Sequence, residues 1–238
     1  MSSNLERRYR ALLRVLPVWY RAEREEEMVG IFLAGRDGDL DAEYGWPGWG
    51  EAWATLGLAV RVRLRARSRA GDVVRLVASA GLLGHVVSAA QGAAAVVRFG
   101  GVWTGWFDAL VVAAFVGLVA GRRVMARVAV AVAALCGVVV ALRAALSAGP
   151  VGWVLVVQVP LWVTAVAVLL GFHREAPPVA RVRWSVAAVV GAVVGAVWGF
   201  LVPLSMAGFG GAWLVAAAVV VVFRPWAGVR AGTPVSAG

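Results

Sequence analysis

One long apolar stretch, residues 73–223, constrains this chain more than any other feature. It consists of blocks rich in Ala, Val, Leu and Gly, and nearly all the charged residues between the blocks are Arg. A membrane-spanning helix needs about 20 mostly apolar residues, and the stretch has room for six such helices. The sequence therefore predicts an all-α polytopic membrane protein whose main partner is the lipid bilayer.

The composition agrees with that class and argues against a soluble nucleic-acid-binding protein. Hydrophobic residues make up 61% of the 238 positions and charged residues 15%, whereas an average soluble domain has about 25% charged residues. The net charge is +10 and every basic residue is Arg. Because these Arg residues follow the ends of the apolar blocks, membrane topology explains them better, and we expect no direct nucleic-acid binding.

Six spans are predicted, and the distribution of Arg orients them. The blocks are 73–97, 106–120, 124–146, 151–171, 185–202 and 206–223. The second block is the shortest and could start as early as Thr104. Of the Arg residues near block ends, 14 fall on one side, and only Arg98 and Arg143 fall on the other. Since Arg is in excess on cytoplasmic sides, we expect a multi-pass plasma-membrane protein with both termini in the cytoplasm.

Trp residues near the block ends are typical of the aromatic belts found at membrane interfaces. On the outer side these include Trp106, Trp153 and Trp213, and on the inner side Trp184 and Trp226. Residues 71–226 would thus form the membrane domain, followed by a short disordered tail at 227–238.

Residues 1–70 predict a small cytoplasmic domain of three helices. Apolar residues from Leu5 to Leu16 recur at helical spacing, and Pro17 suits the first turn of a second helix over 18–33. A third helix is expected from Glu51, with an apolar face made by four residues, Trp53, Leu56, Val60 and Leu64.

The loop before that third helix, residues 35–50, is rich in Gly and Pro and contains Trp46 and Trp49. These two Trp side chains could touch the lipid headgroups or plug the small helical domain, and we slightly favour the plug. After the third helix comes a basic run of five alternating residues: Arg61, Arg63, Arg65, Arg67 and Arg69. It could be a nucleic-acid patch, but its position beside the first span favours an anchor to anionic lipid, worth about 1 kcal/mol per Arg.

Two ridges of small residues predict close helix packing. The fifth block contains Gly191, Gly195 and Gly199, and the first contains Gly84, Ser88 and Gly92. Packing inside one chain is the favoured interpretation, and a homo-oligomer is the alternative.

Polar residues within the apolar blocks are the candidate functional residues, because desolvating them is costly. They are His85, Gln91, Arg98, Asp108, Arg143 and Gln158. Asp108 is the only acid in the blocks, so we expect an ion pair with Arg98 or Arg143. The alternative is an outward-facing polar pocket, opened by a kink at Pro160. His85 either bonds a neighbouring helix or serves in proton relay or ligand contact.

No catalytic motif is visible. The sequence has no P-loop, no GxSxG elbow and no HExxH motif, and Cys136 is its single cysteine. We therefore expect no enzyme activity, no cofactor and no metal site.

The first 65 residues resemble the HAAS domain, the HTH-associated α-helical signalling domain found as a prefix to bacterial permease-like membrane segments. The similarity is carried by residues 5–17, LERRYRALLRVLP, and 20–28, YRAEREEEM. It implies a membrane signalling or regulatory protein that acts by protein contact and is linked to a PadR-like transcription regulator. The alternative is a transporter or permease subunit, whose partner would be a transporter ATPase.

Overall fold

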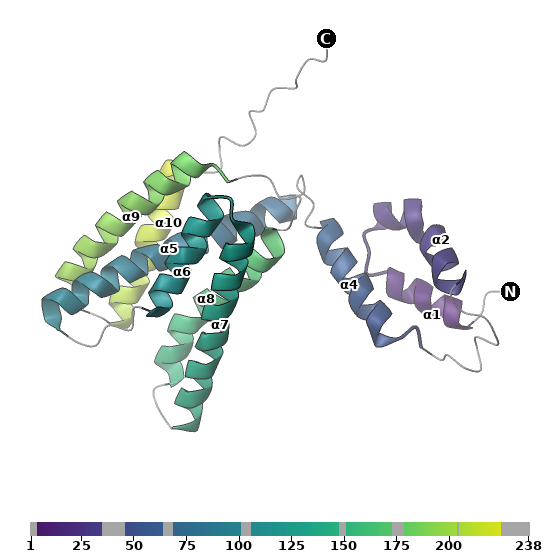
Figure 1. The fold of residues 1–238 in the computed structure, drawn as a ribbon, viewed down its shortest axis with the longest axis horizontal. Coiled ribbons are helices and arrows are strands. Elements are labelled where there is room, and N and C mark those ends of the chain that lie inside the picture. The colour runs from purple at the N-terminus through teal and green to yellow at the C-terminus, as the bar shows by residue number, and fades with distance from the viewer. Residues whose placement is uncertain are drawn as a thin grey trace, which may run out of the picture. The chain divides into compact units, whose positions relative to one another are not determined.

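The computed structural model describes residues 4–34, 46–63, 69–100, 106–147, 151–172, 179–203 and 205–224. The chain divides into two compact units, Met1–Gly71 and Asp72–Gly238, drawn as ribbons in Figure 1. Every regular element in the described ranges is a helix. The predicted tail at 227–238, the loop 35–45, Arg65 and Arg67 lie outside these ranges.

Unit 1 contains three described helices: α1 (Asn4–Leu13), α2 (Val18–Ala34) and α4 (Trp49–Arg63). The first two are joined by a tight turn that ends at Pro17. The backbone N–H of Tyr20 and of Arg21 both donate to the Pro17 carbonyl, at 3.0 Å each. Pro17 lacks an N–H and has a fixed φ, so it starts a helix without losing a hydrogen bond.

Unit 1 has its own hydrophobic core. Tyr9 of α1 stacks on Phe32 of α2 with ring centroids 3.8 Å apart, and Leu5, Leu13 and Ala59 are buried beside them. On the surface, Arg10 of α1 donates to both carboxylate oxygens of Glu26 in α2, at 2.7 and 2.9 Å. The core and this bidentate ion pair both join α1 to α2.

The apolar face that we predicted for the third helix does not form the core. Trp53 is 67% exposed and Leu56 is 43% exposed, while the buried side of α4 is made by Thr55, Ala59 and Val62. Trp49 is 73% exposed, so the prediction that the Trp pair plugs the domain is wrong. Helical spacing identified the stripe correctly, but the small residues on the opposite face allow a closer approach to α1.

The described part of unit 2 contains six helices, and Figure 1 shows their arrangement. They are α5 (Arg69–Phe99), α6 (Trp106–Val119), α7 (Arg123–Leu146), α8 (Val151–Gly171), α9 (Arg181–Leu201) and α10 (Met206–Phe223). Five of them, all except α6, are long and apolar enough to cross a membrane. The expected α-helical membrane protein is confirmed at this level.

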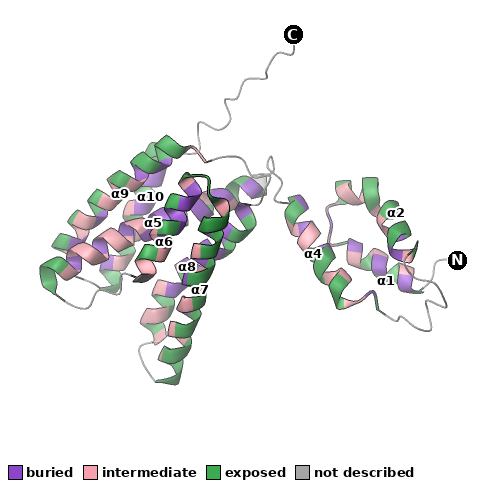
Figure 2. Cartoon of the chain, in the orientation of Figure 1, coloured by how far each residue is buried: buried purple, intermediate pink, exposed green. Residues whose placement is uncertain are grey.

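Large apolar side chains point outward along these helices. On α7 they include Val128, Val132, Leu135, Val139 and Leu142, all more than 40% exposed. Figure 2 marks exposed residues in green along α7 and α9. A protein in water rarely exposes a continuous apolar face of this kind, whereas lipid solvates it without cost. An apolar outer surface of this kind suits contact with lipid.

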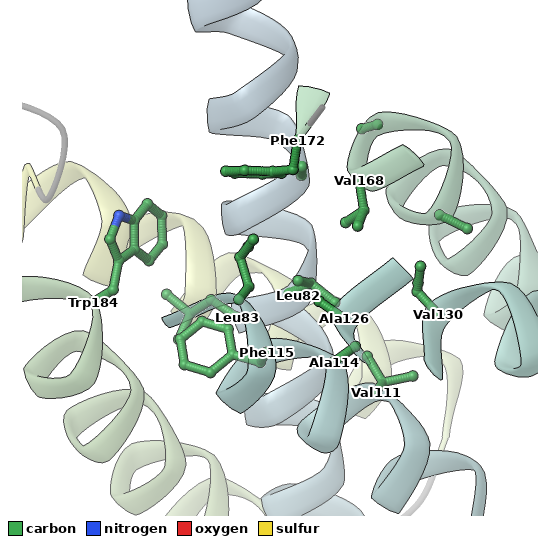
Figure 3. Packing of buried hydrophobic residues seen from close by; sticks show 14 of the residues in the cluster. Leu82, Leu83, Val111, Ala114, Phe115, Ala126, Val130, Val168, Phe172 and Trp184 are labelled. Carbon is green, nitrogen blue, oxygen red and sulfur yellow. The ribbon is translucent and has the colours of Figure 1, made fainter. Parts of the chain in front are cut away.

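Apart from one small cluster around Val87, the described inner side chains form a single large core. Leu82 and Leu83 of α5 lie at its centre, with Phe115 of α6 and Phe172 at the end of α8 (Figure 3). Trp184 of α9 is also in this core and only 4% exposed. The prediction that Trp184 lies in an interfacial belt is therefore wrong, because its indole fills space between helices.

Contacts between helices fix their relative directions within unit 2. A methyl group placed on Gly195 of α9 would lie 2.6 Å from the Val87 carbonyl oxygen of α5, and one on Gly199, one turn later, would clash with the Gln91 carbonyl. Residue numbers rise together along this interface, so α5 and α9 run parallel. Helices α5 and α8 are antiparallel, since Gly171 faces Val74 and Gly81 faces Thr164.

Candidate functional site

A row of polar side chains lies on one face of α5, at positions 85, 88 and 91. This spacing of three residues keeps them on the same side of a helix. The His85 ring is 9% exposed and Gln91 is 1% exposed. His85 Nε2, Ser88 Oγ and Gln91 Nε2 are all buried without a hydrogen-bond partner. Buried polar atoms are nearly always paired in native proteins, so three unpaired atoms in one row mark this face as the candidate site.

Helix α10 covers the row. The Trp213 ring meets the His85 ring edge to face, with centroids 5.1 Å apart. Gly84 makes room for it, because a methyl group there would lie 2.5 Å from the indole ring. Trp213 Nε1 is itself buried without a partner, so the site has four such polar atoms on two helices.

The other end of the row lies where α5, α9 and α10 meet. Gln91 Nε2 would be 3.0 Å from a methyl group at Gly208 of α10. The Gly208 carbonyl accepts from Trp198 Nε1 of α9 at 3.1 Å, and its N–H donates to Ser205 Oγ at 3.0 Å. Ser205 is thus the N-cap of α10 and fixes the turn against which Gln91 packs.

The α8 helix closes the site from a third side. His85 interacts with the backbone at Pro160, and Pro160 lies inside α8. A proline within a helix has no N–H to donate to the carbonyl four residues earlier. The α8 backbone therefore lacks one helical hydrogen bond close to His85. His85 therefore contacts both α8 and α10.

Gln158 belongs to a different interface, between α7 and α8. Its Oε1 atom is buried without a partner and faces Gly137, where a methyl group would lie 2.5 Å away. One turn further along α8, Trp162 Nε1 donates to the Ala134 carbonyl at 3.2 Å. Gln158 is thus close to α7 and apart from the α5 row.

The structure corrects the prediction that Asp108 forms an ion pair with an Arg. Asp108 is half-buried in the first turn of α6, and it forms no ion pair with either Arg98 or Arg143, all three of which the structure describes. Arg98 instead lies over the ring of Phe200 in α9, 5.5 Å from its centroid. Arg143 is exposed on the last turn of α7. A guanidinium over an aromatic face gains a favourable electrostatic contact, which gives Arg98 a different partner.

The two small-residue ridges take different positions. Gly191, Gly195 and Gly199 all face α5, where the Gln91 carbonyl approaches Gly199 most closely. Gly84 lies beneath Trp213, and Ser88 lies in the polar row. Gly92 has open space around it, so it contributes no close contact to another helix.

The predicted lipid anchor is described only in part. Arg61 is exposed, while Arg63 donates to the Val15 carbonyl of unit 1 at 2.7 Å. Arg69 begins α5. Arg63 is therefore partly used to hold α4 against the turn between α1 and α2.

Sequence reasoning missed two features of the site. Trp213 was assigned to an interfacial belt, but it lies in the middle of α10 beside His85. Ser88 was chosen for its size rather than for its hydroxyl, although its spacing from His85 and Gln91 was the signal that could have found the row. Among the described residues, no three His, Cys, Asp or Glu side chains gather as metal ligands.

The fold and its apolar outer surface define a helical membrane protein with a separate N-terminal helical unit. Comparisons with protein-family models, with curated proteins and with solved structures give no match. The resemblance of residues 5–28 to the HAAS domain therefore stays a prediction from those residues.

Proposed function

We propose that this chain is an integral membrane regulatory protein that acts by protein contact through a cytoplasmic N-terminal unit. One observation carries the proposal: unit 1 has a closed core of its own, yet it exposes an apolar stripe on α4. Trp49, Trp53 and Leu56 form this stripe, which we call the Trp face. Trp residues in an exposed apolar patch are frequent at protein-binding sites.

The partner that we propose is a PadR-like transcription regulator, as the HAAS resemblance implies. Acidic residues on α2, including Glu23, Glu26 and Glu27, are exposed and would favour a basic partner surface. The unit would then hold a transcription regulator at the membrane or release it, depending on the state of the membrane helices. In this proposal the chain has no catalytic activity.

Six crossings with both termini in the cytoplasm are part of the proposal. Helices α5 and α9 run parallel, and α5 and α8 run antiparallel. Gly137 of α7 faces Gln158 of α8, and Ala134 faces Trp162, so α7 and α8 are antiparallel and α7 has the direction of α5. The chain must therefore turn back between α5 and α7, which supports a crossing by α6.

The short length of α6 is compatible with that crossing. Its 14 residues extend about 21 Å at 1.5 Å per residue, against a hydrocarbon core of about 30 Å. A short span is accommodated by local thinning of the bilayer at modest cost. Neighbouring helices also cover its C-terminal half, since Phe115 and Leu118 are buried in the core.

The test of the regulatory role uses the full-length protein in nanodiscs and a purified PadR-like regulator from the same genome. We expect binding that W49S/W53S abolishes. The matched control is V18S/I31S, which removes two exposed apolar residues of α2 (73% and 69% exposed) and leaves the Trp face intact. Equal binding by all three proteins would contradict the proposal.

A transporter subunit is the second candidate, because of the unpaired polar row on α5. A transport pathway would hydrate His85, Ser88 and Gln91, and water would then pair the atoms that lack partners. In a C136A background, Ser88→Cys would react with a membrane-impermeant maleimide if the row lined such a pathway. A regulatory protein with a closed interior leaves that cysteine unlabelled, with exposed Ser147→Cys as the positive control.

A further inference from the structure

A basic cavity lies at the end of unit 2 where the α6–α7 turn approaches the start of α9. Its volume is about 640 Å³, and it is lined by Arg122, Arg123 and Arg181 together with apolar residues that include Leu118 and Phe172. These three Arg residues come from two segments nearly sixty positions apart in the sequence. The cavity thus combines a cationic rim with an apolar wall.

The turn that carries two of these Arg residues has a well-defined conformation. Gly121 has φ +81°, and the Arg122 N–H donates to the Gly117 carbonyl at 2.7 Å. A glycine in the left-handed region followed by this hydrogen bond is a common way to end a helix. On the other side, Arg181 Nη2 would lie 3.1 Å from a methyl group at Gly121, so the α9 guanidinium lies directly beside the turn.

Two of the three rim residues, Arg122 and Arg181, have no carboxylate partner within the described part of the chain, whereas Arg123 has another interaction. Neither the Arg122 nor the Arg181 guanidinium forms an ion pair or hydrogen bond there. Beyond Asp108 the whole sequence contains nine Arg residues and a single acid, Glu175. Adjacent guanidinium groups repel one another unless an anion lies between them, and Arg is suited to bidentate contact with phosphate.

The N-termini of α7 and α9 add to the positive potential. Helix α7 starts at Arg123 and α9 at Arg181, and neither has a side-chain cap hydrogen bond. Uncapped N–H groups at a helix start favour an anion. They reinforce the three guanidinium groups and would not define a site alone.

We propose that this cavity binds the headgroup of an anionic phospholipid. The phosphate would lie among Arg122, Arg123 and Arg181, and the first acyl carbons would lie against Leu118 and Phe172. Basic pockets between membrane helices commonly bind such headgroups. An apolar wall suits a lipid better than a free phosphate ion. The inference requires only the membrane fold and is independent of the proposed regulatory role.

The experiment measures the melting temperature of the full-length protein in neutral detergent during titration with short-chain phosphatidylglycerol. Phosphatidylcholine of the same chain length and inorganic phosphate are titrated in parallel. We expect phosphatidylglycerol alone to raise the melting temperature. Replacing two Arg residues in R122Q/R181Q should weaken this binding by about fivefold per Arg. Arg123 is kept, because it has another interaction within the structure.

The matched control is R127Q/R183Q, which removes two exposed Arg residues on the same two helices that do not line the cavity. It should bind phosphatidylglycerol like the unmodified protein. If the R122Q/R181Q protein is not monodisperse, R181Q alone decides, through lipid retained in native mass spectrometry. Equal loss in the control, or an equal effect of phosphatidylcholine, would overturn the proposal. An equal rise of the melting temperature with inorganic phosphate would show that the cavity binds a free anion, and would also overturn the proposal.

Discussion

Gly195 in α9 packs against the backbone carbonyl of Val87 in α5, at a distance that leaves no room for a side chain. A methyl group at position 195 would lie 2.6 Å from that oxygen and 2.9 Å from a methyl carbon of Val87. The neighbouring atoms are backbone, so the contact cannot be relieved by a rotamer change. The parallel α5–α9 pair therefore depends on this glycine.

Gly195→Leu should separate α5 from α9. Overpacked sites typically cost about 1–3 kcal/mol of stability, and we expect a loss of about 3 kcal/mol or more here. The measurement is the melting temperature and the monodispersity of the protein in detergent. Gly210→Leu on α10 is the control, because a side chain there meets nothing within 4 Å. An unchanged melting temperature for Gly195→Leu would show that the two helices are not in this contact.

Asp108 should be energetically independent of both Arg residues to which the sequence pointed. Arg98 lies over Phe200, and Arg143 is exposed, so neither forms an ion pair with Asp108. In double-mutant cycles, D108N with R98Q and D108N with R143Q should each give a coupling within about 0.5 kcal/mol of zero. A coupling of several kcal/mol in either cycle would restore the ion pair that the sequence predicted.

The Arg10–Glu26 pair should make unit 1 sensitive to acid. The Arg10 side chain, by hydrogen bonding, lowers the pKa of Glu26 below its ordinary value of 4.5. A carboxylate whose pKa is lower in the folded state stabilises that state above its unfolded pKa, and the stabilisation is lost as the pH falls through the folded pKa.

Unit 1 should therefore lose stability as the pH falls below about 4.5, and this loss should be smaller in E26Q. Hydrogen exchange in peptides from α1 and α2 of the full-length protein measures the effect, with E27Q as a control at an exposed position that does not contact Arg10. The same acid response in E26Q and the unmodified protein would contradict the assignment.

Removing the Trp face should leave the fold intact. Trp53 is 67% exposed, and surface substitutions usually change stability by less than about 0.5 kcal/mol. W53S should therefore melt like the unmodified protein while losing the regulator binding proposed above. Y9A is the contrasting variant, because loss of a buried aromatic ring costs about 3–5 kcal/mol. A large loss of stability in W53S would place Trp53 in a core contact.

The sequence predicted the helices well because apolar length is a strong signal. The observed bounds of α7, α8 and α10 differ from the predicted blocks by one residue or less. The helices of the first and fifth blocks begin earlier than predicted, since α5 begins at Arg69 and α9 at Arg181. Charged residues in a first turn are tolerated at the membrane surface, and a hydropathy pattern does not register them.

The sequence could not predict which residues contact one another across different helices. The six polar residues within the apolar blocks were visible, but their partners depend on how the helices rotate and cross. The pairing of Asp108 with an Arg was inferred from charge alone, and Phe200 competed for Arg98 through a contact 102 positions away along the chain. Similarly, the sequence placed Trp53 on the apolar face expected for the third helix, whereas Thr55 and Ala59 form the buried side of α4.

The most direct test of the account is the side of the membrane on which each terminus and each loop between the helices lies. Six crossings place the N-terminus and a position after Arg224 in the cytoplasm, and positions after Gly101, Gly149 and Gly208 outside. Alkaline phosphatase fusions, active only outside, and fluorescent-protein fusions, fluorescent only inside, are compared at each position. The account predicts fluorescence after Arg123 and Arg224 and phosphatase activity after Gly101 and Gly149. Phosphatase activity after Arg123 would mean that α6 does not cross the membrane, and would contradict the account.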